Sequence, residues 1–302
     1  MSYKPRILLI DLETSLMEVS TFTLYPESIP HSAIKQDSYI ICGCYKELGS
    51  KEVSAISVTD NARQYKKNHK NDFYVVKELA DVMREADIVI AHNLKAFDLK
   101  KFNARLIYHR LPPLPPFLLI DTLSEARRVA KFSSNRLDYL GQFFGEGKKI
   151  HTSADLWYRV MAGDAAAVDQ MVTYCKQDVN LLEKIYLRLR PYMKSHPHVG
   201  VIAGKYRYES CPHCGSDNII LSKTRTTASG LKRHQKHCKD CGGYSTPSIP
   251  KQQQLNNQTM ARTILVKDKQ PKKKAAAPAK KPAALYTVRG ISSGKGRMVK
   301  PK

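Results

Sequence analysis

Acidic side chains occur at three places where carboxylates could act together. Asp11 and Glu13 come at the end of the first apolar run, Asp98 follows a later one, and Asp178 stands four residues after Tyr174 in a helical stretch. Taken singly, these acids suit a solvated strand end, a helix cap or a surface position equally well. Carboxylates held side by side repel one another, and a divalent cation removes that repulsion. The combination therefore predicts metal-dependent chemistry.

Hydrophobic patterning predicts the elements that would position these acids. Apolar residues within 168–189 mark a buried helix face, with Tyr174 and Asp178 on its flank. Three strands in succession, then strands alternating with helices, indicate an α/β fold with a mixed sheet flanked by helices, in the order of the ribonuclease H-like fold. The predicted strands are 6–11, 39–45, 53–58, 87–91 and 117–120, and the predicted helices are 73–86, 98–110 and most of 122–190.

Three sequence motifs carry a family resemblance over about residues 6–190. DLET, HNLKAFD and YCKQD resemble, in the correct order, the exonuclease motifs of the DEDD 3′–5′ exonucleases. The N-x-x-x-F-D form of the second motif is similar to that of family B DNA polymerase proofreading domains. A tyrosine four residues before the last aspartate is typical of the DEDDy branch. With its trailing cysteine motif, the chain looks most like small bacterial and phage exonucleases of the ribonuclease H-like superfamily.

The resemblance implies a 3′–5′ exonuclease that hydrolyses phosphodiester bonds of nucleic acid, single-stranded DNA above all, by a two-metal-ion mechanism. The implied cofactors are two Mg²⁺ or Mn²⁺ ions, held by four acids, with a tyrosine that orients the attacking water. By the same analogy, Asn93 and Phe97 shape the substrate channel. Asp121 lies either near the metals or at a helix cap. The implied catalytic residues are Asp11, Glu13, Asp98, Tyr174 and Asp178.

Four of the seven cysteines form a second metal-binding pattern. Cys211 and Cys214 are separated by 23 residues from Cys238 and Cys241. Four thiolates suit one structural, tetrahedral Zn²⁺, and the pattern resembles a zinc ribbon with two knuckles on adjacent hairpins. The remaining cysteines lie in apolar segments and are expected to be buried thiols. They are Cys42, Cys44 and Cys175.

The charge of the chain points to a polyanionic partner. The net charge is +23, and residues 251–302 alone hold 14 basic residues against one acid. Nucleic acid is the partner this asymmetry favours, while a solubilising tail is the alternative. The charge does not distinguish DNA from RNA, and DNA is the partner expected from the resemblance. Between the cysteine pairs, basic side chains predict phosphate contacts, with protein docking through the ribbon as the alternative. These residues are Lys223, Arg225, Lys232, Arg233 and Lys236.

Three segments are expected along the chain. They are an exonuclease domain over 1–195, a zinc ribbon over 200–247, and a disordered Lys/Ala/Pro-rich basic tail over 248–302. No stretch is apolar enough to cross a bilayer, and no secretory signal is evident. The expected location of the protein is therefore the cytoplasm of a bacterial or phage-infected cell. A replication or repair protein is a further expected partner, through the ribbon or the tail. Two other functions stay open: a structure-specific endonuclease such as a junction resolvase, and a nucleic-acid-binding protein with a decayed nuclease fold.

Overall fold

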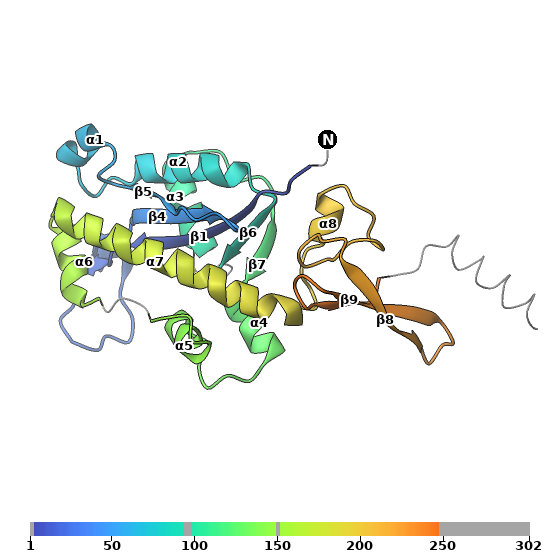
Figure 1. Cartoon of the computed structure of the whole chain (residues 1–302). Coiled ribbons are helices and arrows are strands. Elements are labelled where there is room, and N and C mark those ends of the chain that lie inside the picture. Colours follow the sequence, from blue (N-terminus) through green and yellow to red (C-terminus); the bar gives the residue numbers. More distant parts are fainter. Residues whose placement is uncertain (1–2, 94–97, 149–151, 248–302) are drawn as a thin grey trace, which may run out of the picture. The chain divides into compact units, whose positions relative to one another are not determined.

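A five-stranded mixed sheet organises the N-terminal part of the chain (Figure 1). The structure, a computed structural model, describes residues 3–93, 98–148 and 152–247, all of which belong to one compact unit. The predicted tail and Phe97 lie outside the described residues. The strands are β1 (Ile7–Thr14), β2 (Glu18–Val19), β3 (Ile34–Gln36), β4 (Ile40–Glu47), β5 (Ser54–Ser57), β6 (Ile88–Ala91), β7 (Leu118–Asp121), β8 (Ile219–Thr226), β9 (Lys232–Cys238) and β10 (Tyr244–Ser245).

The strand order of the central sheet is β5-β4-β1-β6-β7. The first three strands of this sheet along the chain pair antiparallel, β1 with β4 and β4 with β5. β6 then pairs in parallel with β1, and β7 pairs in parallel with β6, each after a helix. The predicted mixed α/β fold of the ribonuclease H type is confirmed. Because β1 is central and covered on both faces, its apolar run is continuous rather than alternating.

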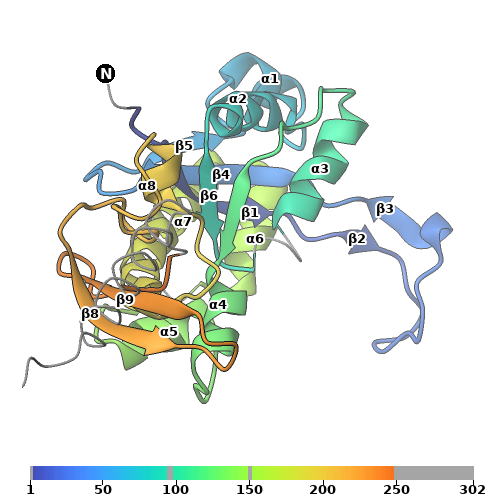
Figure 2. The same ribbon diagram turned by 90° about the vertical axis from the view of Figure 1, so that its right-hand side faces the viewer.

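Helices cover both faces of this sheet (Figure 2). α2 packs on β4 and β5, while α7 packs on β1, β4 and β5 from the other face. No helix among the described residues is long and apolar enough to cross a membrane. The helices are α1 (Ala62–Lys67), α2 (Phe73–Arg84), α3 (Asp98–Tyr108), α4 (Thr122–Val129), α5 (Leu137–Phe143), α6 (Ala154–Met161), α7 (Ala165–Leu189) and α8 (Val199–Ile202).

A buried ion cluster fixes α3, the helix that opens with Asp98. Asp72, at the start of α2, is fully buried and accepts hydrogen bonds from Arg105 at 2.7 Å and from His109 at 2.6 Å. It also accepts from the backbone N–H of Ile40 at 2.9 Å. Buried charges need such complete pairing. The cluster therefore ties β4, α2 and α3 together.

Two features of the N-terminal part were not predicted. β2 and β3 form a small antiparallel hairpin in the link between β1 and β4, and α1 follows β5. The link carries exposed apolar side chains, with Phe22, Leu24 and Tyr25 at least 90% exposed. No apolar alternation marks β2 or β3, because neither strand contributes a buried residue.

The C-terminal part of the described chain is a second, smaller sheet of order β10-β9-β8. β8 and β9 pair antiparallel along most of their length, and β10 adds two residues. Hydrophobic burial in this sheet is slight, since β8 is exposed along nearly its whole length. A sheet this small needs another source of stability, such as a metal site.

Candidate active site and metal centres

Asp11 and Glu13 lie beside each other on one face of β1. Residues two apart on a strand point the same way, and the register with β4 sets Asp11 opposite Cys44 and Glu13 opposite Cys42. Both acids are partly buried, and the preceding part of β1 is buried. The central strand thus presents two carboxylates just where its apolar run ends.

Helix α7 brings a third carboxylate to this face of the sheet. Asp178 lies near the middle of the helix and is 1% exposed. Carboxylate oxygens of Asp11, Glu13 and Asp178 all lie within 4.8 Å of one another. Oxygen ligands are those that Mg²⁺ and Mn²⁺ prefer, and a cation offsets the repulsion of three close anions. This donor set fits a divalent metal ion.

Tyr174 stands one turn before Asp178, so both side chains lie on the same flank of α7. Its side chain is partly buried. It lines a cavity of about 380 Å³ together with Thr152, Thr173 and Arg159. Cavities of this volume hold small molecules. Tyr174 therefore lies at the edge of a space large enough for a small molecule.

Asp98 is the one predicted acid that is not among the three carboxylates within 4.8 Å of one another. It opens α3, is 5% exposed and directly follows residues 94–97, which are not described. Burial raises the pKa of Asp98 to about 7, and the nearby carboxylate of Asp121 adds to the rise. Without a cation this carboxyl therefore stays largely protonated up to neutral pH.

Asp121 caps helix α4. Its Oδ1 accepts hydrogen bonds from the backbone N–H groups of Leu123 at 3.0 Å and Ser124 at 3.3 Å. The same oxygen accepts from the N–H of Asn93 at 3.0 Å. Asn93 has a φ of 71°, in the left-handed region that asparagine tolerates better than most residues. Of the two roles left open by the sequence, the structure shows the cap, which also holds the turn after β6.

Three thiols lie against the paired acids. Cys42, Cys44 and Cys175 are fully buried, as predicted. The Sγ atom of Cys175 is 3.4 Å from the backbone oxygen of Asp11 and 3.7 Å from its Oδ2. Their place beside the candidate ligands was not predicted. The two cysteines on β4 are two residues apart, as are the two acids on β1. The register between β1 and β4 sets the cysteines opposite the acids, and this register cannot be read from the sequence.

A sequence profile of the RNase H superfamily matches residues 36–190, which is about half of the chain. The chain belongs to the RNase H superfamily. The matched range contains Asp98, Tyr174 and Asp178, whereas β1 with Asp11 and Glu13 precedes it.

This RNase H superfamily chain was also matched to a solved structure. It is similar to a family B DNA polymerase from the hyperthermophilic archaeon Pyrobaculum calidifontis, with a TM-score of 0.45 and 14% sequence identity. The likeness covers 66% of this chain and 26% of the polymerase chain, so the chain spans about a quarter of that protein's length. Comparison with curated protein sequences gives no match.

The four predicted zinc ligands come together after the superfamily domain. The Sγ atoms of Cys211 and Cys241 are 3.6 Å apart, as are those of Cys214 and Cys238, and all four lie within 4.8 Å of one another. Zn–S bonds of about 2.3 Å in a tetrahedron put the sulfurs about 3.8 Å apart. Burial raises the pKa of the Cys241 thiol to about 11. The cluster fits a closed structural Zn²⁺ site that releases protons when it fills.

The register of the small sheet sorts the predicted phosphate-binding residues onto its faces. Arg225 pairs directly with Arg233, and Lys223 pairs with Gln235 two positions along, on the same face. Like charges directly opposite destabilise a sheet. Neither arginine forms an ion pair within the described part of the chain, and both are exposed. An anionic partner would relieve this repulsion.

Lys236 differs from the other predicted contacts. Its Nζ lies 3.5 Å from the centroid of the Tyr208 ring and donates to the Tyr208 backbone oxygen. Partial burial lowers the pKa of Lys236. This lysine is engaged within the protein, while Lys223, Arg225 and Lys232 extend from exposed positions.

Proposed function

We propose that this chain is a metal-dependent 3′–5′ exonuclease that acts on single-stranded nucleic acid, DNA in preference to RNA. One observation carries the proposal: Asp11, Glu13 and Asp178 converge within 4.8 Å, with Tyr174 one helical turn away, in a chain of the RNase H superfamily. Residues of the first and third motifs, which lie far apart in the sequence, meet at this point. That convergence supports a nuclease site more than a set of separate surface acids.

In this proposal, Asp11, Glu13 and Asp178 hold catalytic Mg²⁺ or Mn²⁺, and Asp98 is the fourth acid of the site. When bound, two such ions activate water and stabilise charge on the leaving oxygen. Tyr174 orients the attacking water through its hydroxyl. Phenols ordinarily stay protonated at neutral pH, so we assign this tyrosine a positioning role and not that of a base.

We further propose that the chain divides into an exonuclease domain (1–195), a zinc ribbon (200–247) and a basic tail (248–302). The ribbon holds one Zn²⁺ through its four cysteines. The exposed basic side chains of the ribbon, with those of the tail, raise the affinity for nucleic acid without reading its sequence. Catalysis and affinity are thus carried by different segments.

The test is a nuclease assay on 5′-labelled single strands of DNA and RNA in parallel. With Mg²⁺ or Mn²⁺ we expect a ladder of products shortened from the 3′ end, and with a chelator no products. Asp11→Asn and Asp178→Asn should each abolish hydrolysis while the fold is retained, because each removes a charged metal ligand. Asp169→Asn is the matched control, since Asp169 is an exposed acid on the same helix.

Other substrates separate the two rival functions. Cleavage of a circular single strand or of a four-way junction, without stepwise shortening, would identify a structure-specific endonuclease. Tight binding without hydrolysis in any metal would identify a binding protein with a decayed site. Full activity of Asp178→Asn would overturn the assignment of the site itself.

A further inference from the structure

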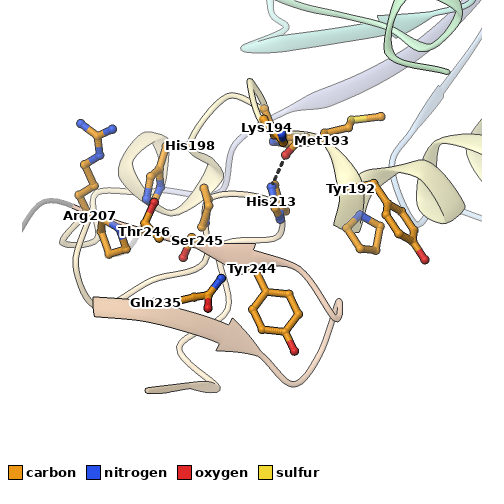
Figure 3. A pocket seen from close by; sticks show the side chains of 14 residues that line it. Tyr192, Met193, Lys194, His198, Arg207, His213, Gln235, Tyr244, Ser245 and Thr246 are labelled. Atoms are coloured by element: carbon orange, nitrogen blue, oxygen red, sulfur yellow. Dashed lines mark hydrogen bonds between the residues drawn. The ribbon is translucent and has the colours of Figure 1, made fainter. Parts of the chain in front are cut away.

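A cavity of about 600 Å³ lies at the base of the ribbon, beside the segment 191–198 that follows α7 (Figure 3). Its lining includes Tyr192, Lys194, Arg207 and Tyr244, and all of its charged side chains are basic. Neither Lys194 nor Arg207 forms an ion pair among the described residues. The cavity is therefore electropositive and suits an anionic ligand.

Internal contacts hold the cavity in shape. His213 is 4% exposed, and its Nε2 shares a hydrogen bond of 2.8 Å with the backbone oxygen of Met193. The N–H of Val199 donates to the oxygen of Pro212 at 2.8 Å. At Gly243 an added Cβ would lie 2.2 Å from the ring of His213, so the ribbon backbone meets that ring without room for a side chain. These contacts join the ribbon to the end of the superfamily domain.

Aromatic rings stand open at this cavity. Tyr192 is 69% exposed and Tyr244 is 54% exposed. The Tyr244 ring stacks on His237, with centroids 4.5 Å apart and an angle of 24° between the planes. One face of the tyrosine is thus supported by histidine and its exposed part is available to a ligand. Nucleobases stack on such rings whatever their identity.

The cavity continues into the basic face of the small sheet. Residues 233, 235 and 237 of β9 alternate onto one face. Their cross-strand partners on that face include Arg225, Lys223 and Tyr244. One side of the sheet therefore runs from a stacked aromatic pair, past Gln235, to the exposed pair of arginines. Such a surface offers ring stacking at one end and phosphate contacts along its length.

We propose that this face of the ribbon, with the cavity at its base, binds unpaired nucleotides of single-stranded nucleic acid. Bases stack at Tyr244 and Tyr192, while Lys194, Arg207 and the paired arginines bind phosphates. A duplex keeps its bases stacked inside and cannot offer them to tyrosine, so the site selects single strands. The inference rests on the proposed function, to which it adds a second binding site remote from the carboxylates in the sequence.

The experiment measures binding by fluorescence anisotropy with the full-length chain carrying Asp178→Asn, in Ca²⁺, so that no hydrolysis occurs. The probes are a labelled oligothymidylate of about 20 nucleotides and a duplex of equal length. Tyr244→Ala should weaken single-strand binding about fivefold or more, the loss expected for one stacked base, and duplex binding less than twofold. Tyr244→Phe should bind like the parent, because the ring remains.

Matched controls isolate the site. Tyr206→Ala removes a ribbon tyrosine that is 78% exposed and does not line the cavity, and it should bind like the parent. Arg207→Gln should weaken single-strand binding and reduce the salt slope by about 0.7, whereas Arg63→Gln on α1 should not. The zinc content of each variant reports an intact ribbon.

Unchanged binding of zinc-loaded Tyr244→Ala, equal losses on single strand and duplex, or an equal loss with Tyr206→Ala would overturn the proposal. Hydrolysis is not measured, so a chain that lacks nuclease activity would still reveal this site. The two proposals can therefore fail separately.

Discussion

Removal of the Tyr174 hydroxyl is the most specific test of the proposed catalytic mechanism. Tyr174→Phe keeps the ring and its packing on α7 but loses the hydroxyl to which we assign the orientation of water. We expect hydrolysis to slow by at least about tenfold, and by as much as the 10²–10⁴-fold typical of a positioned proton-transfer group. Metal affinity measured by calorimetry should not change, because the three converging carboxylates remain. Tyr158→Phe on α6, where the side chain is 62% exposed, is the control.

Asp98 makes stability depend on pH. Folding raises its pKa from the model-peptide value of 3.8 to about 7, chiefly through burial. The folded chain thus binds this proton more tightly than the unfolded chain, so the stabilising contribution is complete below about pH 4 and is lost as the pH rises through about 7. The effect is on the order of a few kcal/mol.

The measurement is thermal unfolding of Asp98→Asn and the parent in buffer without Mg²⁺ or Mn²⁺. Asparagine does not titrate, so the melting temperature of the variant should rise relative to that of the parent between about pH 4 and pH 7 and be the higher of the two at pH 8. Asp169→Asn should follow the parent at every pH. Parallel curves for Asp98→Asn and the parent would show that this carboxyl does not carry the raised pKa.

At the residue scale, local periodicity was enough to predict part of the site. A spacing of two residues on a strand places Asp11 and Glu13 on one face. A spacing of four residues on a helix places Tyr174 one turn from Asp178. The thiols behind these acids and the hydrogen bond from Asn93 to Asp121 depend on strand register and on a turn between elements. Neither leaves a periodic trace in the sequence.

Among the elements, the small sheet is the one we expect to depend most on the proposed zinc ion. It buries little apolar surface, so its four cysteines should supply much of its stability through zinc. Cys238→Ser should lower the zinc content from one ion per chain to near zero and should remove a separate unfolding transition. Hydrolysis of a mononucleotide ester, which is too small to reach the ribbon, should persist. His234→Ala should retain zinc, and a full zinc content in Cys238→Ser would contradict the cluster.

The strands and helices of the larger sheet were predicted well because burial drives them. All five central strands and most helices coincide with apolar runs or amphipathic stretches in the sequence. β2, β3 and α1 were missed for the same reason, since none of the three contributes a buried residue. Pattern reading finds elements that face a core and overlooks those that do not.

At the scale of the whole molecule, charge and chemistry are separated along the chain. Residues 251–302 carry 14 basic residues and one acid. A chain that ends at residue 247 should keep its zinc and its turnover at saturating substrate. Its affinity should fall, and the slope of log affinity against log salt should flatten, because each lost phosphate contact lowers that slope by about 0.7 on a single strand.

The check is a salt titration of binding for the two lengths of chain on one oligonucleotide. A third protein, in which a neutral Gly/Ser/Gln segment of equal length replaces 248–302, separates charge from length. Equal slopes for all three would mean that the tail does not contact nucleic acid. The composition of the tail predicted its charge, but which charges meet a strand depends on the complex and not on the chain alone.

The length of helix α7 has a consequence for the length of the substrate. It runs unbroken from Ala165 to Leu189 and leads directly into the 3₁₀ turn Arg190–Tyr192 beside the cavity. Asp178 and Leu189 are therefore held about 16 Å apart along a rigid rod, close to the rise of five stacked nucleotides at about 3.4 Å each. If one nucleic-acid strand contacts the ribbon and the carboxylates together, the length of α7 sets the shortest strand that can reach both. If the chain has the proposed exonuclease activity, degradation would then leave short oligonucleotides instead of mononucleotides alone.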